Sequence, residues 1–337
     1  MMGSELPWGV NILARIGMTT TVPVEVILAA GHVAVDLNNV FITGAEPVRR
    51  VESAENAGFP RNICGWIKGL YSTVIDSNCV DAVIAVTQGD CSNTHALMET
   101  WEMAGVRVIP FAYPFDRDVD MLRLQMQKMA EALGADWDQV LKAKHGLDRI
   151  RRKVAEMDRL TWQDNRVSGT DNHLLQVSCS DFNGNVQRFE TELDEFLAAA
   201  VKAPVRKERI RLGYIGVPPI FTDLYAYIES MGARVVFNEV QRQFAMPYNE
   251  PDIIEQYRKY TYPHGIFFRL EDIRAEVENR KLDGLIHYVQ SFCYRQIEDM
   301  IVRKKLDIPI LTVEGDKPGC LDARTRLRID GFIEMLK

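Results

Sequence analysis

The chain has 337 residues, with 40 Lys and Arg against 47 Asp and Glu, so its net charge is −7 at neutral pH. An acidic balance of this kind argues against nucleic acid as the main partner. The sequence shows no signal-peptide pattern and no apolar run of membrane-spanning length, so we expect a cytoplasmic protein that does not act in a membrane.

Six cysteines are spread along the chain without a CxxC pair: Cys64, Cys79, Cys91, Cys179, Cys293 and Cys320. Disulfides are not expected in a cytoplasmic protein, so these thiols are candidates for metal binding, catalysis or plain burial. We expect Cys79, Cys179 and Cys320 to be structural.

The first part of the chain predicts a helix followed by a strand. Pro23 suits a first helical position and Glu25 the first turn, Gly31 ends the helix, and the strand runs over His32–Leu37. Residues 44–58 are interpreted as a polar loop.

A cysteine then occurs near the start of each of two further helices. At the first of these helices, Cys64 follows Pro60 and Asn62. Cys91 follows the predicted strand 82–86, where ligands collect in parallel sheets and a helix N-terminus favours a thiolate. Ser92 or Asn93 is expected to cap the helix after Cys91.

The stretch around Cys91 has a counterpart near the other end of the chain. Residues 81–111 and 283–313 align without a gap, so that Asp81 matches Asp283, Gln88 matches Gln290 and Cys91 matches Cys293. Residues 26–38 and 227–239 share a second pattern. This repeat predicts two flavodoxin-like or Rossmann-like α/β domains with parallel sheets, at 1–115 and 206–337, joined by a helical segment at 116–205.

The rest of the second domain is less regular. Residues 237–266 are aromatic and polar without a simple period, and we interpret them as a loop-rich lid or interface. GxGxxG and GxxxxGK[ST] phosphate loops are both absent from the sequence, so the chain itself is not expected to hydrolyse nucleotides.

Three cysteines delivered by different segments could meet in the crevice between the domains. Three thiolates suit a four-iron, four-sulfur cubane with one iron left open, although zinc also binds three cysteines, and spacing alone does not choose between them. Glu25 and Ser92 are the candidate catalytic residues. Each also has a structural interpretation, Glu25 as a partner of the helix dipole and Ser92 as a helix cap.

Several motifs together resemble the 2-hydroxyacyl-CoA dehydratase and benzoyl-CoA reductase family, specifically the cluster-carrying subunits of its D-component. They are, in order, PxExxxAAG (23–31), PRNxC (60–64), DxVxxVxxxxC (81–91), QxxC (290–293), ExD (314–316) and RxRxxxFxEML. The motifs span most of the chain.

The resemblance implies one [4Fe-4S] cluster per chain, held by Cys64, Cys91 and Cys293. Members receive an electron from a separate ATP-hydrolysing iron–sulfur activator and pass it to an acyl-CoA thioester, whose ketyl radical loses water or is reduced further. It also implies a second subunit, identical or paralogous. Since residues 213–290 contain no cysteine, one cubane is expected rather than a double one.

Two other interpretations stay open on the sequence. The chain could be an ATP-dependent reductase of another small molecule, similar to relatives that carry a double cubane. It could also be a non-catalytic electron carrier or scaffold subunit.

Overall fold

The fold contains two four-stranded parallel sheets, one in each half of the chain. The structure is a computed structural model that describes residues 14–337. The first sheet has the order β2-β1-β3-β4, built from β1 (Arg15–Met18), β2 (Val33–Asp36), β3 (Ala82–Gln88) and β4 (Val108–Ala112). The second has the order β6-β5-β7-β8, built from β5 (Ile210–Ile215), β6 (Ala233–Asn238), β7 (Gly284–Val289) and β8 (Ile310–Glu314). The predicted α/β class is confirmed, and the two sheets share one topology, as the repeat requires.

The repeat extends to individual hydrogen bonds at the start of the central strands. Asp81 accepts a hydrogen bond from the backbone N–H of Arg15, and Asp283 accepts one from Arg211, both at 2.7 Å. In return, the N–H of each aspartate donates to the carbonyl of the same arginine at 2.8 Å. Each aspartate therefore fixes the register of the two middle strands in its half.

The helices of the first half differ from the predictions at two places. These helices are α1 (Val24–Ala29), α2 (Leu37–Thr43), α3 (Pro47–Asn56), α4 (Gly65–Ser77) and α5 (Thr94–Met103). Helix α1 begins one residue later than predicted, since Pro23 is its N-cap. The predicted polar loop at 44–58 is wrong, because residues 47–56 form α3 with Pro47 in the first turn and Val51 and Ala54 buried.

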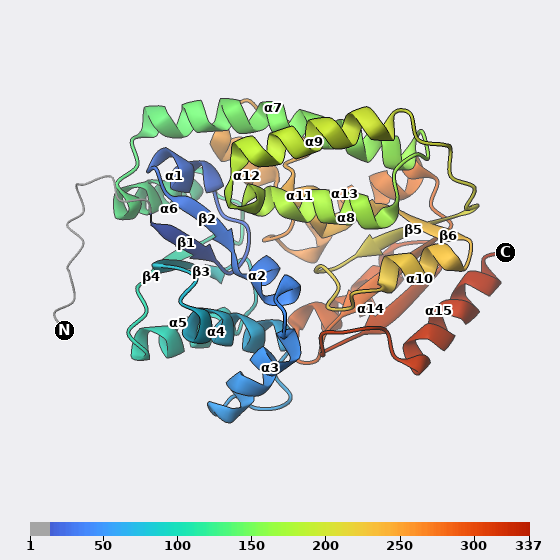
Figure 1. The fold of residues 1–337 in the computed structure, drawn as a ribbon, viewed down its shortest axis with the longest axis horizontal. Coiled ribbons are helices and arrows are strands. Elements are labelled where there is room, and N and C mark those ends of the chain that lie inside the picture. The colour runs from blue at the N-terminus through green and yellow to red at the C-terminus, as the bar shows by residue number, and fades with distance from the viewer. Residues whose placement is uncertain (1–13) are drawn as a thin grey trace.

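A set of helices connects the two halves, in the segment predicted to be helical. It comprises α6 (Val119–Leu133), α7 (Trp137–Trp162), α8 (Gly169–Val177) and α9 (Val186–Ala200), with two short 3₁₀ turns at Ser178–Ser180 and Phe182–Gly184. Helix α7 contacts α1 of the first half and β6 of the second, and it runs along the length of the molecule beside α9 (Figure 1). Its packing ties both sheets to one helical layer.

The helices of the second half correct one interpretation. They are α10 (Leu224–Ser230), α11 (Glu239–Phe244), α12 (Ile253–Lys259), α13 (Ile266–Arg280), α14 (Tyr294–Lys305) and α15 (Ala323–Met335). The stretch 237–266 is not a loop-rich lid, because it contains α11 and α12 and its Tyr257 and Tyr260 are fully buried. Its aromatic residues belong to the core.

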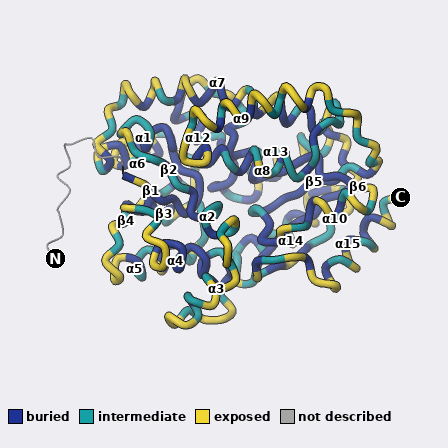
Figure 2. The backbone as a smooth tube through the Cα atoms, viewed as in Figure 1, coloured by how far each residue is buried: buried dark blue, intermediate teal, exposed yellow. Residues whose placement is uncertain are grey.

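Burial follows the strands and the inner faces of the helices (Figure 2). The largest apolar cluster joins the first sheet to the helical segment and to the tyrosines of α12 and the residues just after it. Of the helices between residues 14 and 337, none combines the length and the apolarity needed to cross a membrane.

Candidate functional site

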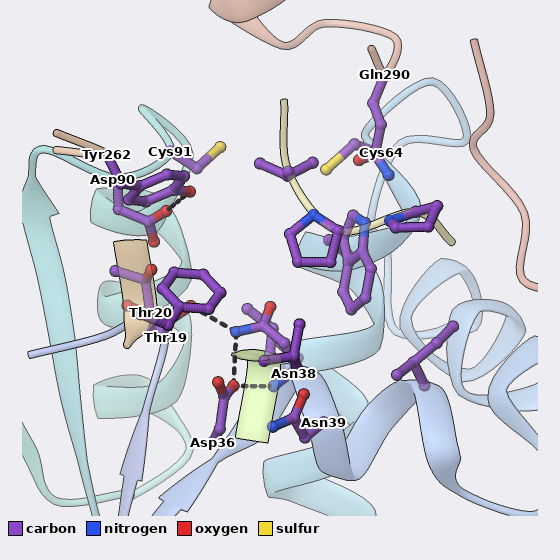
Figure 3. Close-up of a pocket in the computed structure, with 18 of the residues that line it drawn as sticks. Thr19, Thr20, Asp36, Asn38, Asn39, Cys64, Asp90, Cys91, Tyr262 and Gln290 are labelled. Carbon is purple, nitrogen blue, oxygen red and sulfur yellow. Dashed lines mark hydrogen bonds between the residues drawn. The ribbon is translucent and has the colours of Figure 1, made fainter. Parts of the chain in front are cut away.

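A cavity of about 300 Å³ lies between the two halves, at the carboxyl ends of their strands. The residues that line it follow β1, β2 and β3 in the first half and β5 and β7 in the second, with further side chains from α8 and α4. Cys64, Cys91 and Cys293 all line this cavity. The structure therefore brings together the three cysteines that the sequence analysis selected. Figure 3 shows Cys64 and Cys91 at one end of the pocket.

Each of these cysteines lies at the start of a helix. Cys64 and Cys293 are the N-cap residues of α4 and α14. Cys91 lies between β3 and α5, where its Sγ accepts a hydrogen bond from the N–H of Asn93 at 3.4 Å. The positive end of a helix stabilises a nearby anion, so all three positions favour a thiolate ligand.

The three thiols also influence one another. Burial raises the pKa of Cys64 to about 12, and the nearby Cys293 raises it further in the same direction. Burial raises the pKa of Cys91 as well, with Cys64, Asp90 and Cys293 adding to the effect, and burial raises the pKa of Cys293. All three shifts favour the protonated thiols, and a bound cationic centre would favour the thiolates instead.

The three pocket cysteines form a donor set whose ligand type fits an iron–sulfur cluster. In the part of the chain that the structure describes, no three His, Cys, Asp or Glu side chains are gathered closely enough to hold one metal ion. Thiolates are the ligands that iron–sulfur clusters use, and zinc also binds three cysteines.

A buried arginine stands beside Cys293, and the sequence analysis missed it. Arg295 is 4% exposed, donates from Nη2 to the carbonyl of Tyr262 at 2.7 Å, and places its guanidinium 4.6 Å from the centre of the Tyr262 ring. The charge of Arg295 lowers the pKa of Cys293, against the larger effect of burial. In the sequence, only the position of Arg295 two residues after Cys293 indicated that it could lie at the site.

Asp90 lines the pocket next to Cys91. The hydroxyl of Tyr262 donates to its Oδ1 at 2.9 Å, and Thr94 Oγ1 lies 3.4 Å from its Oδ2. Burial raises the pKa of Asp90 to about 6, although Tyr262 and Arg295 oppose this shift. Tyr262 comes from the stretch interpreted as a lid, so no sequence pattern placed it here.

The aligned glutamines of the repeat have different surroundings. Gln290 is buried, lines the pocket and donates from Nε2 to the hydroxyl of Tyr288 at 2.8 Å. Tyr288 in turn donates to the carbonyl of Gly315 at 2.7 Å. Gln88 is exposed and is not a lining residue. The repeat therefore predicts equivalent backbone positions for the two glutamines but not equivalent surroundings of their side chains.

The two halves approach closely beside Cys64. A Cβ on Gly65 would lie 2.4 Å from the carbonyl oxygen of Asp316 and 2.9 Å from Cδ1 of Ile220, both in the second half. No real side chain tolerates such a contact with backbone, so glycine after Cys64 is a condition of the interface. A second glycine, Gly89, has the same role near Cys91, since its Cβ would lie 2.7 Å from Pro263 Cβ.

The two candidate catalytic residues do not line the pocket. Glu25 is completely buried, and Arg151 Nη1, Gln256 Nε2 and Tyr257 Oη donate to its carboxylate at 2.6, 3.0 and 2.7 Å. Burial opposes its ionisation, but Arg151 and Tyr257 outweigh that effect and hold the pKa of Glu25 below its ordinary value. These contacts are those of a structural anion.

Ser92 is exposed, and the predicted cap of α5 is absent. Helix α5 begins after Asn93, whose side chain makes no capping hydrogen bond.

The other cysteines also lie outside the pocket. Cys179 is buried and donates to the carbonyl of Leu175 at 3.3 Å, Cys79 donates to that of Thr73 at 3.6 Å, and Cys320 is exposed.

The remote end of the pocket is polar and follows β1 and β2. Asp36, Asn38, Asn39, Thr19 and Thr20 lie there, apart from Cys64 and Cys91 (Figure 3). We refer to these five residues as the far end of the pocket. Sequence reasoning did not select any of them, because none carries a motif by itself.

The chain matches one family of known proteins over nearly its whole length. A sequence model of the family described as 2-hydroxyglutaryl-CoA dehydratase, D-component, matches residues 19–336. The match begins just after β1 and includes strands β2 to β8, the helical segment and all three pocket cysteines. No curated protein was found to match the chain.

Proposed function

Because the chain belongs to the 2-hydroxyglutaryl-CoA dehydratase D-component family, we propose that it is an iron–sulfur subunit of a 2-hydroxyacyl-CoA dehydratase. In this proposal Cys64, Cys91 and Cys293 hold one [4Fe-4S] cluster, a separate ATP-hydrolysing activator supplies the electron, and an acyl-CoA thioester is the substrate. Dehydration is favoured over reduction because the family is a dehydratase component.

One observation carries the proposal: three cysteines from three segments line one cavity between the halves. A free cysteine by itself usually has a packing role, but here three of them lie at helix N-termini around one cavity. The cavity is large enough for a ligand beside the cysteines. Three protein ligands would leave one position of a cubane free for substrate.

When bound, a cluster of this type supplies one-electron transfer at low potential. The residues of the chain supply the surroundings for that chemistry. Arg295 places a buried positive charge beside Cys293, which offsets the negative charge that three thiolates bring into a site of low dielectric. Trp66, Val217 and Phe221 line the same cavity and limit the access of water to it.

The cofactor part of the proposal is tested by anaerobic purification followed by iron and sulfide analysis and electron paramagnetic resonance (EPR). About four irons per chain and a cubane signal are expected. Cys91→Ala and Cys293→Ala should lose the signal, whereas Cys320→Ala and Cys179→Ala should keep it. Zinc in place of iron, or no metal, would contradict the cluster.

The catalytic part is tested by turnover of 2-hydroxyacyl-CoA with an ATP-dependent activator. Formation of the enoyl-CoA product is expected only with activator, ATP and an intact Cys91. A protein that holds the cluster and accepts the electron but converts no thioester would instead be a carrier or scaffold. Reduction of an unrelated small molecule under the same conditions would favour the reductase alternative.

A further inference from the structure

The far end of the pocket has a charge distribution that selects among acyl groups. Among the described residues that line the pocket, Arg295 is the only lysine or arginine, and it stands beside Cys293, in contact with Tyr262. Residues 1–13 contain neither lysine nor arginine, so they bring no cationic side chain. The carboxyl groups of the lining are Asp36 and Asp90.

Asp36 of the far end lies next to a second buried carboxyl group, Asp181, which does not line the pocket. The backbone N–H of Asp36 donates to Asp181 Oδ2 at 2.7 Å, and both side chains are buried. No ion pair between residues 14 and 337 includes either aspartate at 4.0 Å or less. Burial raises the pKa of Asp36, and burial with the charge of Asp36 raises that of Asp181 to about 7. This pair of carboxyl groups is therefore neutral or negative and never positive.

The donors of Asn38 at the far end already have acceptors. Asn38 donates from its backbone N–H to Asp36 Oδ1 at 2.9 Å and from Nδ2 both to Asp36 Oδ1 and to the Thr19 carbonyl, each at 2.9 Å. A ligand anion here would have to compete with these bonds. Burying an anion without a cation to pair with it is costly.

The walls that lead to the far end are mostly apolar. Six of these side chains are Ile42, Trp66, Leu70, Leu174, Val177 and Phe244. His173 also lines the pocket, and burial lowers its pKa to about 4, so it is a neutral ring at physiological pH. Apolar surface of this kind gains free energy from an aliphatic or aromatic chain.

We propose that the acyl chain of the substrate extends from the cysteines to the far end of the pocket, that this chain is uncharged, aliphatic or aromatic, and that the far end rejects a second carboxylate. A 2-hydroxydicarboxylic thioester such as 2-hydroxyglutaryl-CoA would place its terminal carboxylate near Asp36 with no cation to pair with it. This inference rests on the proposed function and specifies its substrate class.

The test compares two thioesters on the cluster-loaded protein: 2-hydroxyglutaryl-CoA and a branched six-carbon 2-hydroxyacyl-CoA without a second carboxylate. Dissociation constants come from calorimetry and kcat/KM from turnover with activator. The uncharged thioester should bind at least 100-fold more tightly. Equal or tighter binding of 2-hydroxyglutaryl-CoA would overturn the inference and leave the dehydratase function intact. Binding of neither thioester, nor of an aromatic 2-hydroxyacyl-CoA, would overturn both.

Variants of the far end test the cause of the selection. Asn39→Arg adds a cation near Asp36 and should improve binding of 2-hydroxyglutaryl-CoA at least 10-fold without improving binding of the uncharged thioester. Asn39→Gln, which adds length without charge, should give no such gain. Asp36→Asn keeps an N-cap acceptor for α2 and should reduce the discrimination several-fold. Discrimination unchanged in both Asn39→Arg and Asp36→Asn would overturn the electrostatic explanation.

Discussion

Replacement of Glu25 by glutamine separates a structural role from a catalytic one. Glutamine keeps the shape of the side chain and one acceptor oxygen but removes the charge that Arg151, Gln256 and Tyr257 now contact. Removing one partner of a buried ion pair costs about 3–5 kcal/mol, because the other charge stays buried. Arg151 retains Asp148 at 3.5 Å, so we expect the lower value, about 3 kcal/mol.

The expected change in melting temperature follows from the size of the chain. An unfolding entropy of about 2.1 cal/mol/K per residue gives roughly 0.7 kcal/mol/K for 337 residues that unfold together. A loss of 3 kcal/mol then lowers Tm by about 4 °C, which differential scanning calorimetry resolves. Because the folded pKa of Glu25 is lowered, its stabilisation is present above its ordinary pKa and disappears as pH falls through the folded value.

The matched control is Glu102→Gln, which makes the same chemical change at an exposed position of α5. It should leave Tm within about 1 °C of the wild-type value. A Glu25→Gln protein with wild-type stability and abolished turnover would refute the structural interpretation. It would restore Glu25 as a catalytic candidate despite its place outside the pocket.

Three further predictions concern the interface, the far end and the repeat. Gly65→Ala should lower the free energy of unfolding by about 1–3 kcal/mol, since the added Cβ would meet the backbone of the other half. Gly146→Ala in α7, with open space around it, should raise that free energy by up to about 1 kcal/mol. Urea denaturation measures both, and an unchanged stability of Gly65→Ala would contradict the close approach. The free energy of unfolding of Asp181→Asn relative to wild type should increase by about 1 kcal/mol or more as pH rises from 5 to 8. An acid with a raised folded pKa destabilises the native state as pH rises from the ordinary pKa of 3.8 toward the folded pKa of about 7. A pH-independent difference would show that the pKa of Asp181 is not perturbed. Asp81→Ala and Asp283→Ala should destabilise by similar amounts, about 1 kcal/mol each, in the same assay, and a large inequality would show that the two register contacts are not equivalent.

The sheets and the pocket cysteines could be predicted from the sequence because their signals are local or repeated. A buried strand is a short apolar run, and the gapless alignment of 81–111 with 283–313 doubled the evidence for each element. The same alignment placed Cys91 and Cys293 at equivalent strand ends, which the structure confirms.

The stretch 237–266 could not be predicted because its contacts are distant in sequence. Tyr257 and Gln256 donate to Glu25 from 232 and 231 residues away, so their burial leaves no periodic pattern nearby. Helix α3 is a different case. Its proline at the start and its buried Val51 and Ala54 were readable signals, and the abundance of charged residues obscured them.

The far end of the pocket was invisible for a third reason. Asp36 has an ordinary helix-capping role and Asn38 lies in the first turn of the helix that it caps, and only the fold shows that both also face a cavity. Whether a capping residue contacts a ligand depends on which segment is packed opposite, and that is decided by tertiary structure.

The position of Gly65 against Asp316 has a consequence for how the protein matures. Cys64 and Cys91 belong to one half and Cys293 to the other, with more than half the chain between them. A nascent or partly folded chain therefore cannot present all three sulfurs at once. A cofactor that needs all three cysteines would therefore be completely bound only after the two halves have docked, so its binding would report that the two halves are assembled.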